Sequence, residues 1–171
     1  MSRPFGHLDE HGAARMVDVT GKPTTLRQAT AAASVRCAPH VVAALRDGAV
    51  PKGDVLAVAR VAGISGAKRT ADLLPLAHVI GVHGVEIGLE VTDTGVEVLA
   101  TVRAVDRTGV EMEALTAAAV AALAVLDMVK GLDRTTSIEG VRLLAKSGGR
   151  SGDWTRPDDR TGPGDRTGPG G

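Results

Sequence analysis

Apolar and polar residues alternate along three stretches of the chain, with the two-residue period of a half-buried β-strand. The first stretch is Leu26–Cys37, and the second is a hairpin over residues 85–102 that turns at Asp93-Thr94-Gly95. The third is Val141–Lys146, and Met16–Val19 is a shorter strand candidate. The pattern therefore predicts several strands connected mainly by turns and helices.

A longer apolar period predicts helices over Pro39–Arg46, Val55–Thr70 and Glu111–Gly131. The third helix is rich in alanine and apolar on nearly all sides, which is typical of a helix buried against a sheet or another subunit. Gly63 and Gly66 interrupt the second helix, and we expect them to let another backbone approach closely. Between the second helix and the hairpin we expect an apolar loop.

Antiparallel strands with helices packed on them predict an α+β fold, and the order of elements is compatible with a ferredoxin-like sheet. We expect a single domain over residues 15–156, preceded by a flexible N-terminus at residues 1–14. Residues 157–171 contain two copies of Asp-Arg-Thr-Gly-Pro-Gly, a composition that cannot bury a core, so this tail is expected to be disordered.

The amino-acid composition argues against nucleic acid and membranes as binding partners. The formal net charge is +0, from 20 basic and 20 acidic residues, so no overall field attracts nucleic acid or an anionic membrane. Phe5 and Trp154 are the only aromatic residues, which excludes base-stacking platforms for single-stranded nucleic acid. No stretch is predicted to be a signal peptide or a membrane span, so we expect a cytoplasmic protein. Cys37, the single cysteine, has no base nearby in sequence and is expected to be inert packing.

The predicted long helix carries charged residues at both ends. Glu111 and Glu113 lie in its first turn, and Asp127 and Lys130 lie in its last turn. Because an α-helix rises 1.5 Å per residue, Glu113 and Asp127 are separated by roughly 20 Å. If both ends are functional, a pocket completed by a second copy of the chain is the simplest arrangement. The alternative for Asp127 and Lys130 is a surface ion pair that contributes little.

Basic residues also occur at the ends of other predicted elements. Lys52 precedes Asp54, the predicted N-cap of the second helix, a position suited to phosphate. Lys68 and Arg69 lie near the end of that helix, where compensation of the helix dipole explains them equally well. Arg27 is at the start of the apolar face of the first strand, so it either points inward or is a solvated arginine at the edge.

A glycine-rich segment at residues 147–152 follows Lys146 and contains Arg150, so its backbone N–H groups could converge on an anion. A flexible loop before the tail is the competing interpretation. His78 and His83 have no partners at metal-ligand spacing, so we predict no metal site. The chain also lacks the Gly-x-Ser-x-Gly nucleophile elbow. These residues together indicate acid–base catalysis on a phosphorylated metabolite.

Several strings occur in order between residues 16 and 154. They are MVDV (16–19), KGDV (52–55), ARVAGI (59–64), AKRT (67–70), LPLAH (74–78), GVEMEALTA (109–117), DMVK (127–130) and LLAKSGGRSGD (143–153). Together they resemble the MoaC family, the cyclic pyranopterin monophosphate synthases of molybdenum cofactor biosynthesis. The resemblance covers almost the whole predicted domain.

The resemblance implies a lyase that converts cyclised dihydro-GTP to cyclic pyranopterin monophosphate and releases pyrophosphate. It also implies a ferredoxin-like fold and a homo-hexamer, a trimer of dimers with pockets at the subunit interfaces. No cofactor of the protein's own is implied, and whether Mg²⁺ accompanies the triphosphate stays open.

By the same resemblance, Asp127 matches the family's catalytic aspartate, with Lys130 and Lys52 as proton-transfer lysines. The positions that match substrate-binding or other pocket residues of the family are Leu76, Ala77, His78, Met112, Glu113, Arg27, Lys68, Arg69, Glu111 and Lys146. The chain departs from the family at Ala77, where cysteine is common, and at Val79, where proline is common.

Two alternatives to the enzyme stay open. One is a non-catalytic purine-nucleotide-binding module that is oligomeric, and the other is a structural oligomer whose apolar helix is only a subunit interface. Asp127 beside two lysines favours the enzyme, because phosphate binding alone needs no carboxylate.

Overall fold

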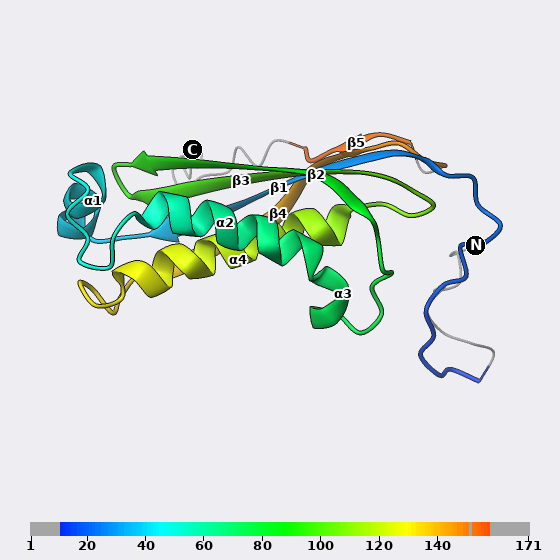
Figure 1. Cartoon of the computed structure of the whole chain (residues 1–171), viewed down its shortest axis with the longest axis horizontal. Coiled ribbons are helices and arrows are strands. Elements are labelled where there is room, and N and C mark those ends of the chain that lie inside the picture. The colour runs from blue at the N-terminus through cyan, green and yellow to red at the C-terminus, as the bar shows by residue number, and fades with distance from the viewer. Residues whose placement is uncertain (1–10, 151, 158–171) are drawn as a thin grey trace, which may run out of the picture.

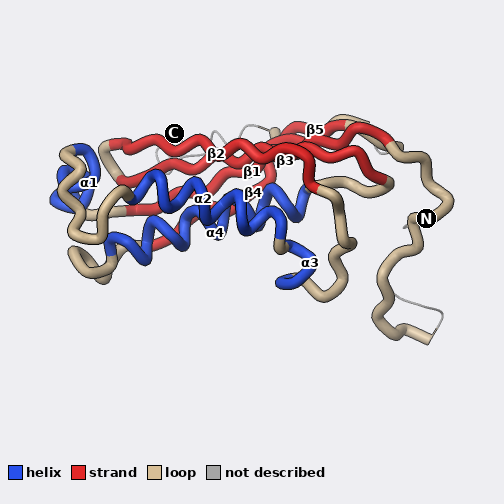
Figure 2. The backbone as a smooth tube through the Cα atoms, viewed as in Figure 1, coloured by secondary structure: helices blue, strands red, loops and turns tan. Residues whose placement is uncertain are grey.

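The computed structural model describes residues 11–150 and 152–157, which form one β-sheet and a layer of helices (Figures 1 and 2). In chain order the elements are β1 (Thr25–Arg36), α1 (Pro39–Arg46), α2 (Val55–Lys68), α3 (Thr70–Leu73), β2 (Val82–Thr92), β3 (Gly95–Asp106), α4 (Glu111–Val129), β4 (Ser137–Ser147) and β5 (Trp154–Thr155). The predicted α+β class is confirmed.

The strands form one antiparallel sheet in the order β2-β3-β1-β4-β5. Strand β1 lies at its centre, where Ala31 pairs with Ala100 of β3 and with Leu143 of β4. Residues at every second position of β1 from Arg27 to Val35 are buried, as the alternating pattern predicts. The hairpin of β2 and β3 is confirmed as well, with its turn after Thr92.

Helices α2 and α4 cover one face of the sheet, lying side by side and running in opposite directions (Figure 1). A Cβ atom at Gly63 would lie 3.1 Å from the Cβ of Ala121, and one at Gly66 would lie 2.9 Å from the Cβ of Val120. These two glycines therefore permit the close helix–helix contact that the sequence predicts. Asp54 caps α2 as predicted, accepting a hydrogen bond from the backbone N–H of Ala57 at 2.9 Å.

The expectation that no stretch is long and apolar enough to span a membrane is wrong for helix α4. Its most apolar window has a mean hydropathy of 1.8, which passes that test by length and composition. In the structure α4 contacts β1, β3, β4 and α2, and 44% of this window is buried, so packing within the domain accounts for part of its apolar composition. Its buried residues are Glu113, Ala114, Ala117, Ala118, Ala121, Ala122, Val125 and Val129.

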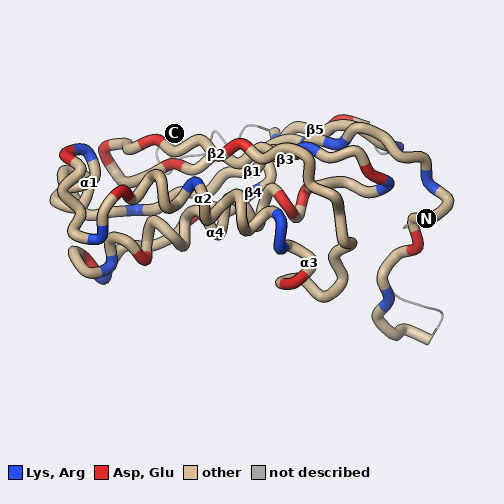
Figure 3. The backbone as a smooth tube through the Cα atoms, viewed as in Figure 1, with Lys and Arg blue, Asp and Glu red and all other residues tan. Residues whose placement is uncertain are grey.

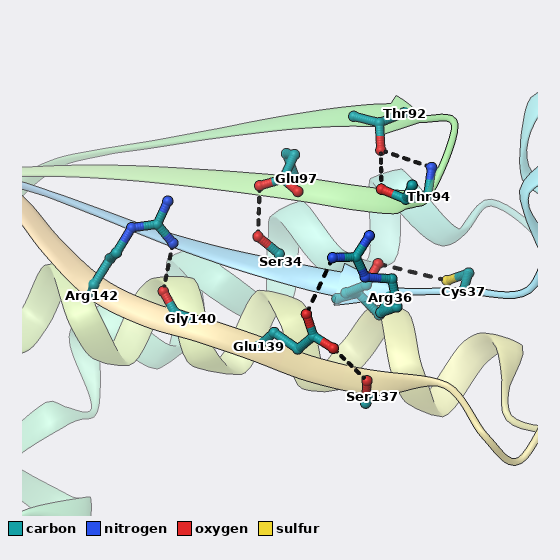
Figure 4. A network of polar contacts seen from close by, with 11 residues as sticks. Ser34, Arg36, Cys37, Thr92, Thr94, Glu97, Ser137, Glu139, Gly140 and Arg142 are labelled. Carbon is teal, nitrogen blue, oxygen red and sulfur yellow. Dashed lines mark hydrogen bonds and ion pairs between the residues drawn. The ribbon is translucent and has the colours of Figure 1, made fainter. Parts of the chain in front are cut away.

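The opposite face of the sheet carries polar contacts between neighbouring strands (Figure 4). Ser34 donates to Glu97 at 2.7 Å, and Arg36 pairs with Glu139 at 3.4 Å. Cys37, at the end of β1, is buried, and its thiol points to the Val35 carbonyl oxygen at 3.8 Å. Burial, with a smaller contribution from Asp133, raises the pKa of this thiol, which is unfavourable for a nucleophile.

Several local predictions were wrong. Met16–Val19 is not a strand, and the short helix α3 (Thr70–Leu73), which was not predicted, lies between α2 and the expected apolar loop. Strand β4 begins earlier than its alternating pattern indicates, at Ser137, and β5 was not predicted. The N-terminus and tail fall largely on residues 1–10 and 158–171, outside the described residues, so their flexibility and the domain bounds remain predictions.

Candidate active site

The three residues predicted to be catalytic meet at the C-terminal end of α4. The Lys130 ammonium lies 2.7 Å from one carboxylate oxygen of Asp127, and the Lys52 ammonium lies 3.1 Å from the other. Lys52 also donates to the backbone carbonyl oxygen of Asp127 at 2.7 Å. Asp127 therefore holds two ammonium groups at one place. The pair of Asp127 and Lys130 is more than the isolated surface ion pair that sequence alone left open.

Two separate segments build this cluster. Asp127 lies in the last turn of α4, and Lys130 is the residue at its C-terminal cap. Lys52 arrives from the loop before α2, just ahead of Gly53, whose φ of 99° is strained for other residues. The side chains of Lys52, Asp127 and Lys130 are 45%, 58% and 56% exposed, so a ligand can reach all three.

Electrostatics keep Asp127 ionised. Hydrogen bonds from Lys130 and Lys52, reinforced by their positive charges, lower the pKa of Asp127 below its ordinary value. An ionised carboxylate between two ammonium groups can organise proton transfer to and from a ligand bound beside it.

A cationic cavity of about 860 Å³ lies at the other end of the long helix, near its N-terminus. Its basic lining residues are Lys22, Arg27, Arg107, Lys146 and Arg150. Glu111 also lines the cavity, and its carboxylate pairs with the Lys146 ammonium at 2.9 Å. Backbone of Gly148 and Gly149 completes one wall, so the glycine-rich segment is part of a cavity with excess positive charge.

A second cavity of about 430 Å³, here called the histidine cavity, adjoins the first through Lys22, Thr108, Gly109 and Glu111, which line both. It contains the predicted substrate-binding residues Leu76, Ala77, His78, Met112 and Glu113. The Nε2 atom of His78 lies 2.7 Å from the carbonyl oxygen of Val17. That contact fixes the orientation of the imidazole ring.

Glu113 is the buried carboxyl group of the histidine cavity. Its side chain is 3% exposed, and Oε2 has no hydrogen-bond partner within the described residues. Burial is the main cause that raises the pKa of Glu113 to about 7, with smaller contributions from the carboxylates of Glu111 and Asp106 and against the opposing effects of its own backbone and His78. Near neutral pH this group can therefore donate or accept a proton.

Within one chain, the predicted site residues do not all lie together. Arg27, Glu111 and Lys146 join the cationic cavity and the five residues above join the histidine cavity. Asp127 and its lysines lie at the opposite end of α4. Lys68 and Arg69 line neither cavity, and Arg69 lies 3.9 Å from Asp72. Figure 3 shows basic and acidic residues at both ends of the helical layer.

Some lining residues were not identified from the sequence. No pattern in the sequence assigned Lys22 or Arg107 to a site, although both line the cationic cavity. Val17 was assigned to a strand, whereas it lines the histidine cavity and orients His78. A basic residue in a turn is too common a signal to have identified these positions.

The described residues contain no group of three or more His, Cys, Asp or Glu side chains placed to hold a metal ion. That no metal is needed remains a prediction, because phosphate oxygens of a ligand also coordinate metal ions.

Comparison with known proteins identifies the family. A model of the MoaC family matches residues 16–149, which include both cavities' principal residues and the Asp127 cluster. The chain belongs to the MoaC family. The chain is 61% identical over 150 residues to a cyclic pyranopterin monophosphate synthase of Streptomyces coelicolor, covering 88% of each protein. It is 55% identical over 158 residues to that of a Nocardioides species, covering 91% of this chain and 97% of the relative.

A further MoaC relative is the protein named cyclic pyranopterin monophosphate synthase 2 in Mycobacterium tuberculosis. It is 54% identical over 155 residues, covering 91% of this chain and 93% of the relative. The family suggested by the strings of the sequence is thus confirmed. The roles of individual residues rest on the geometry described above.

Proposed function

We propose that the chain is a lyase of molybdenum cofactor biosynthesis, converting cyclised dihydro-GTP to cyclic pyranopterin monophosphate and pyrophosphate. The observation that carries the proposal is the Asp127 carboxylate held between the ammonium groups of Lys52 and Lys130. The names of its MoaC relatives support the same reaction. A phosphate-binding module needs cations but not an acid–base cluster of this kind.

The residues suit the parts of this reaction. The cationic cavity binds the triphosphate, and the histidine cavity, with its apolar Leu76 and Met112, binds the purine-derived ring. Closing the cyclic phosphate forms a bond from a substrate hydroxyl to phosphorus and breaks the bond to pyrophosphate. The hydroxyl proton is removed by a base, and the ammonium groups of Lys52 and Lys130 offset the negative charge of the leaving group.

The active site is completed by a second chain. Asp127 lies 14 positions after Glu113 on a straight helix, roughly 20 Å at 1.5 Å per residue, too far for one small ligand to bridge. In a symmetric oligomer the Asp127 end of one copy can face the cavities of another. We infer the homo-hexamer, a trimer of dimers, on this ground and from the family resemblance.

The finer fold assignment is also a proposal. The order β1-α2-β2-β3-α4-β4, with β1 between β3 and β4, corresponds to two interleaved β-α-β units of a ferredoxin-like sheet. We expect the enzyme in the cytoplasm, where a nucleotide-derived substrate is made. A cofactor of the protein's own is not part of the proposal, and Mg²⁺ is expected only as a companion of the triphosphate.

The direct test supplies purified protein with cyclised dihydro-GTP. We expect cyclic pyranopterin monophosphate and pyrophosphate in equal amounts, detected by mass spectrometry and a pyrophosphate assay. Tight binding of the nucleotide without either product would instead identify a non-catalytic purine-nucleotide-binding module.

If each active site is built from two chains, two inactive variants that damage different halves of the site should restore activity when they are mixed. Asp127→Asn chains and Lys146→Ala chains are each expected to be inactive alone, because each lacks one half of every site. After dissociation and joint reassembly, random pairing should give about a quarter of the wild-type activity, since one site in four combines two intact halves.

The control mixes Asp127→Asn with Lys52→Ala, which damage the same end of α4. No activity should return, because no chain supplies an intact Asp127 cluster. Activity in this control, or none in the first mixture, would contradict a site built from two chains.

A further inference from the structure

Arg27 is a buried arginine at the start of β1 whose guanidinium contacts backbone, although the family resemblance places it among substrate-binding positions. It is 8% exposed. Its Nε donates to the carbonyl oxygen of Asp106 at 3.3 Å, and its Nη2 donates to that of Arg107 at 3.2 Å. Its Nη1 donates to the carbonyl oxygen of Gly148 at 3.3 Å.

These three carbonyls belong to two loops that are far apart in the sequence. Asp106 is the last residue of β3 and Arg107 follows it, whereas Gly148 follows β4. The strands that carry both loops flank β1, so Arg27 bridges the two edges of the strand on which it lies. Both loops line the cationic cavity and supply it with Arg107 and Arg150.

The glycine-rich loop is shaped to fit against Arg27. Gly148 and Gly149 have φ values of 88° and 80°, a region that other residues rarely adopt. A Cβ atom at Gly149 would overlap the Nη1 atom of Arg27, and one at Gly148 would overlap the carbonyl oxygen of Leu26. Glycine at both positions therefore permits the close approach of this loop to the start of β1.

We propose that Arg27 is a positioning residue that ties the 106–109 and 147–150 loops together into one anion-binding wall, and that it is not itself a phosphate ligand. The inference rests on the proposed function, because it assigns the cationic cavity to the triphosphate. Carbonyl dipoles that end in a cavity disfavour a bound anion. Arg107 and Gly148, whose carbonyl oxygens accept from Arg27, both line the cavity, so Arg27 offsets these dipoles beside the bound anion.

The test measures binding of tripolyphosphate to the assembled protein by calorimetry, so that it does not depend on turnover. Arg27→Ala and Arg27→Lys should both weaken binding by about tenfold or more, because neither can hold three carbonyls and the loops must then be ordered by the ligand. With cyclised dihydro-GTP, KM should rise by a similar factor while kcat changes little. A residue that only stabilised the fold would lower the thermal midpoint without this selective loss.

Gly149→Ala provides an independent variant, since its methyl group displaces Arg27 without removing charge. It should weaken tripolyphosphate binding about as much as Arg27→Ala, and the double variant should be no worse than Arg27→Ala alone. Gly48→Ala is the matched control for backbone strain: Gly48 has a φ of 63° with no atom within 4 Å of its added Cβ. That control should bind tripolyphosphate as the wild type does.

Full affinity in Arg27→Lys would show that charge at this position is sufficient and would overturn the proposal. Additive losses in the double variant would overturn it too. If Arg27→Ala does not fold, Arg27→Lys and Gly149→Ala decide the question. If the wild-type protein does not bind tripolyphosphate, the cationic cavity is not the triphosphate site and the inference is overturned. The proposed function is tested separately, by turnover of the cyclised nucleotide.

Discussion

Replacing Asp127 with asparagine is expected to lower the rate of product formation by about 10²–10⁴-fold, the usual contribution of a positioned acid–base group. Asparagine keeps the size of the side chain but removes the charge that attracts the ammonium groups of Lys52 and Lys130. These two cations would then repel each other, and the proton-transfer groups would lose their common anchor. The measurement is single-turnover formation of pyrophosphate and of the cyclic phosphate.

The fold should survive this change, because the Asp127 side chain is 58% exposed. Circular dichroism and the oligomer mass are the controls. Arg46→Ala is a matched comparison, since it breaks an exposed ion pair with Asp93 and should leave turnover unchanged. Wild-type turnover in Asp127→Asn would remove this carboxylate from the mechanism.

The second large effect concerns stability and pH at Glu113. Because burial raises its pKa from 4.5 to about 7, the folded protein keeps a proton that the unfolded chain releases in this interval. Below pH 4.5 the group is protonated in both states and costs nothing. As the pH rises toward 7, folding must take up a proton and stability falls, by about 3 kcal/mol in total. Above 7 the full penalty is present.

Glu113→Gln removes this penalty, because the amide stays neutral at every pH. We therefore expect the free energy of unfolding of the variant, relative to wild type, to be more favourable at pH 8 than at pH 4.5 by about 2–3 kcal/mol. Urea titrations at the two pH values measure this difference, and any constant cost of the amide cancels. The charge of His78 opposes the shift of the Glu113 pKa.

Glu90→Gln is the control, since Glu90 is an exposed carboxyl on β2 and its replacement should change stability equally little at both pH values. Equal stability differences for Glu113→Gln at pH 4.5 and pH 8 would contradict a buried carboxyl that holds its proton.

The sequence alone determined the elements whose side chains follow a clear period. The alternating residues of β1, the hairpin of β2 and β3, and the exact bounds of α1 follow from local pattern, because one face of each must be buried. Asp54 at the start of α2 and the glycines facing α4 were recognisable for the same kind of local reason. The family could also be recognised from the sequence, because the short sequence strings that the chain shares with it are specific.

The tertiary structure alone decided which charged residues meet. Lys52 and Asp127 are 75 positions apart, and Lys146 and Glu111 are 35 apart, so no local pattern pairs them. Glu111 and Glu113 look alike in sequence, yet only Glu113 turns into the core. Met16–Val19 has the pattern of a strand, but a strand exists only where a neighbour accepts its hydrogen bonds, and here the Val17 carbonyl meets His78 instead. Charge and periodicity are local properties, whereas partners are set by how the sheet and helices pack.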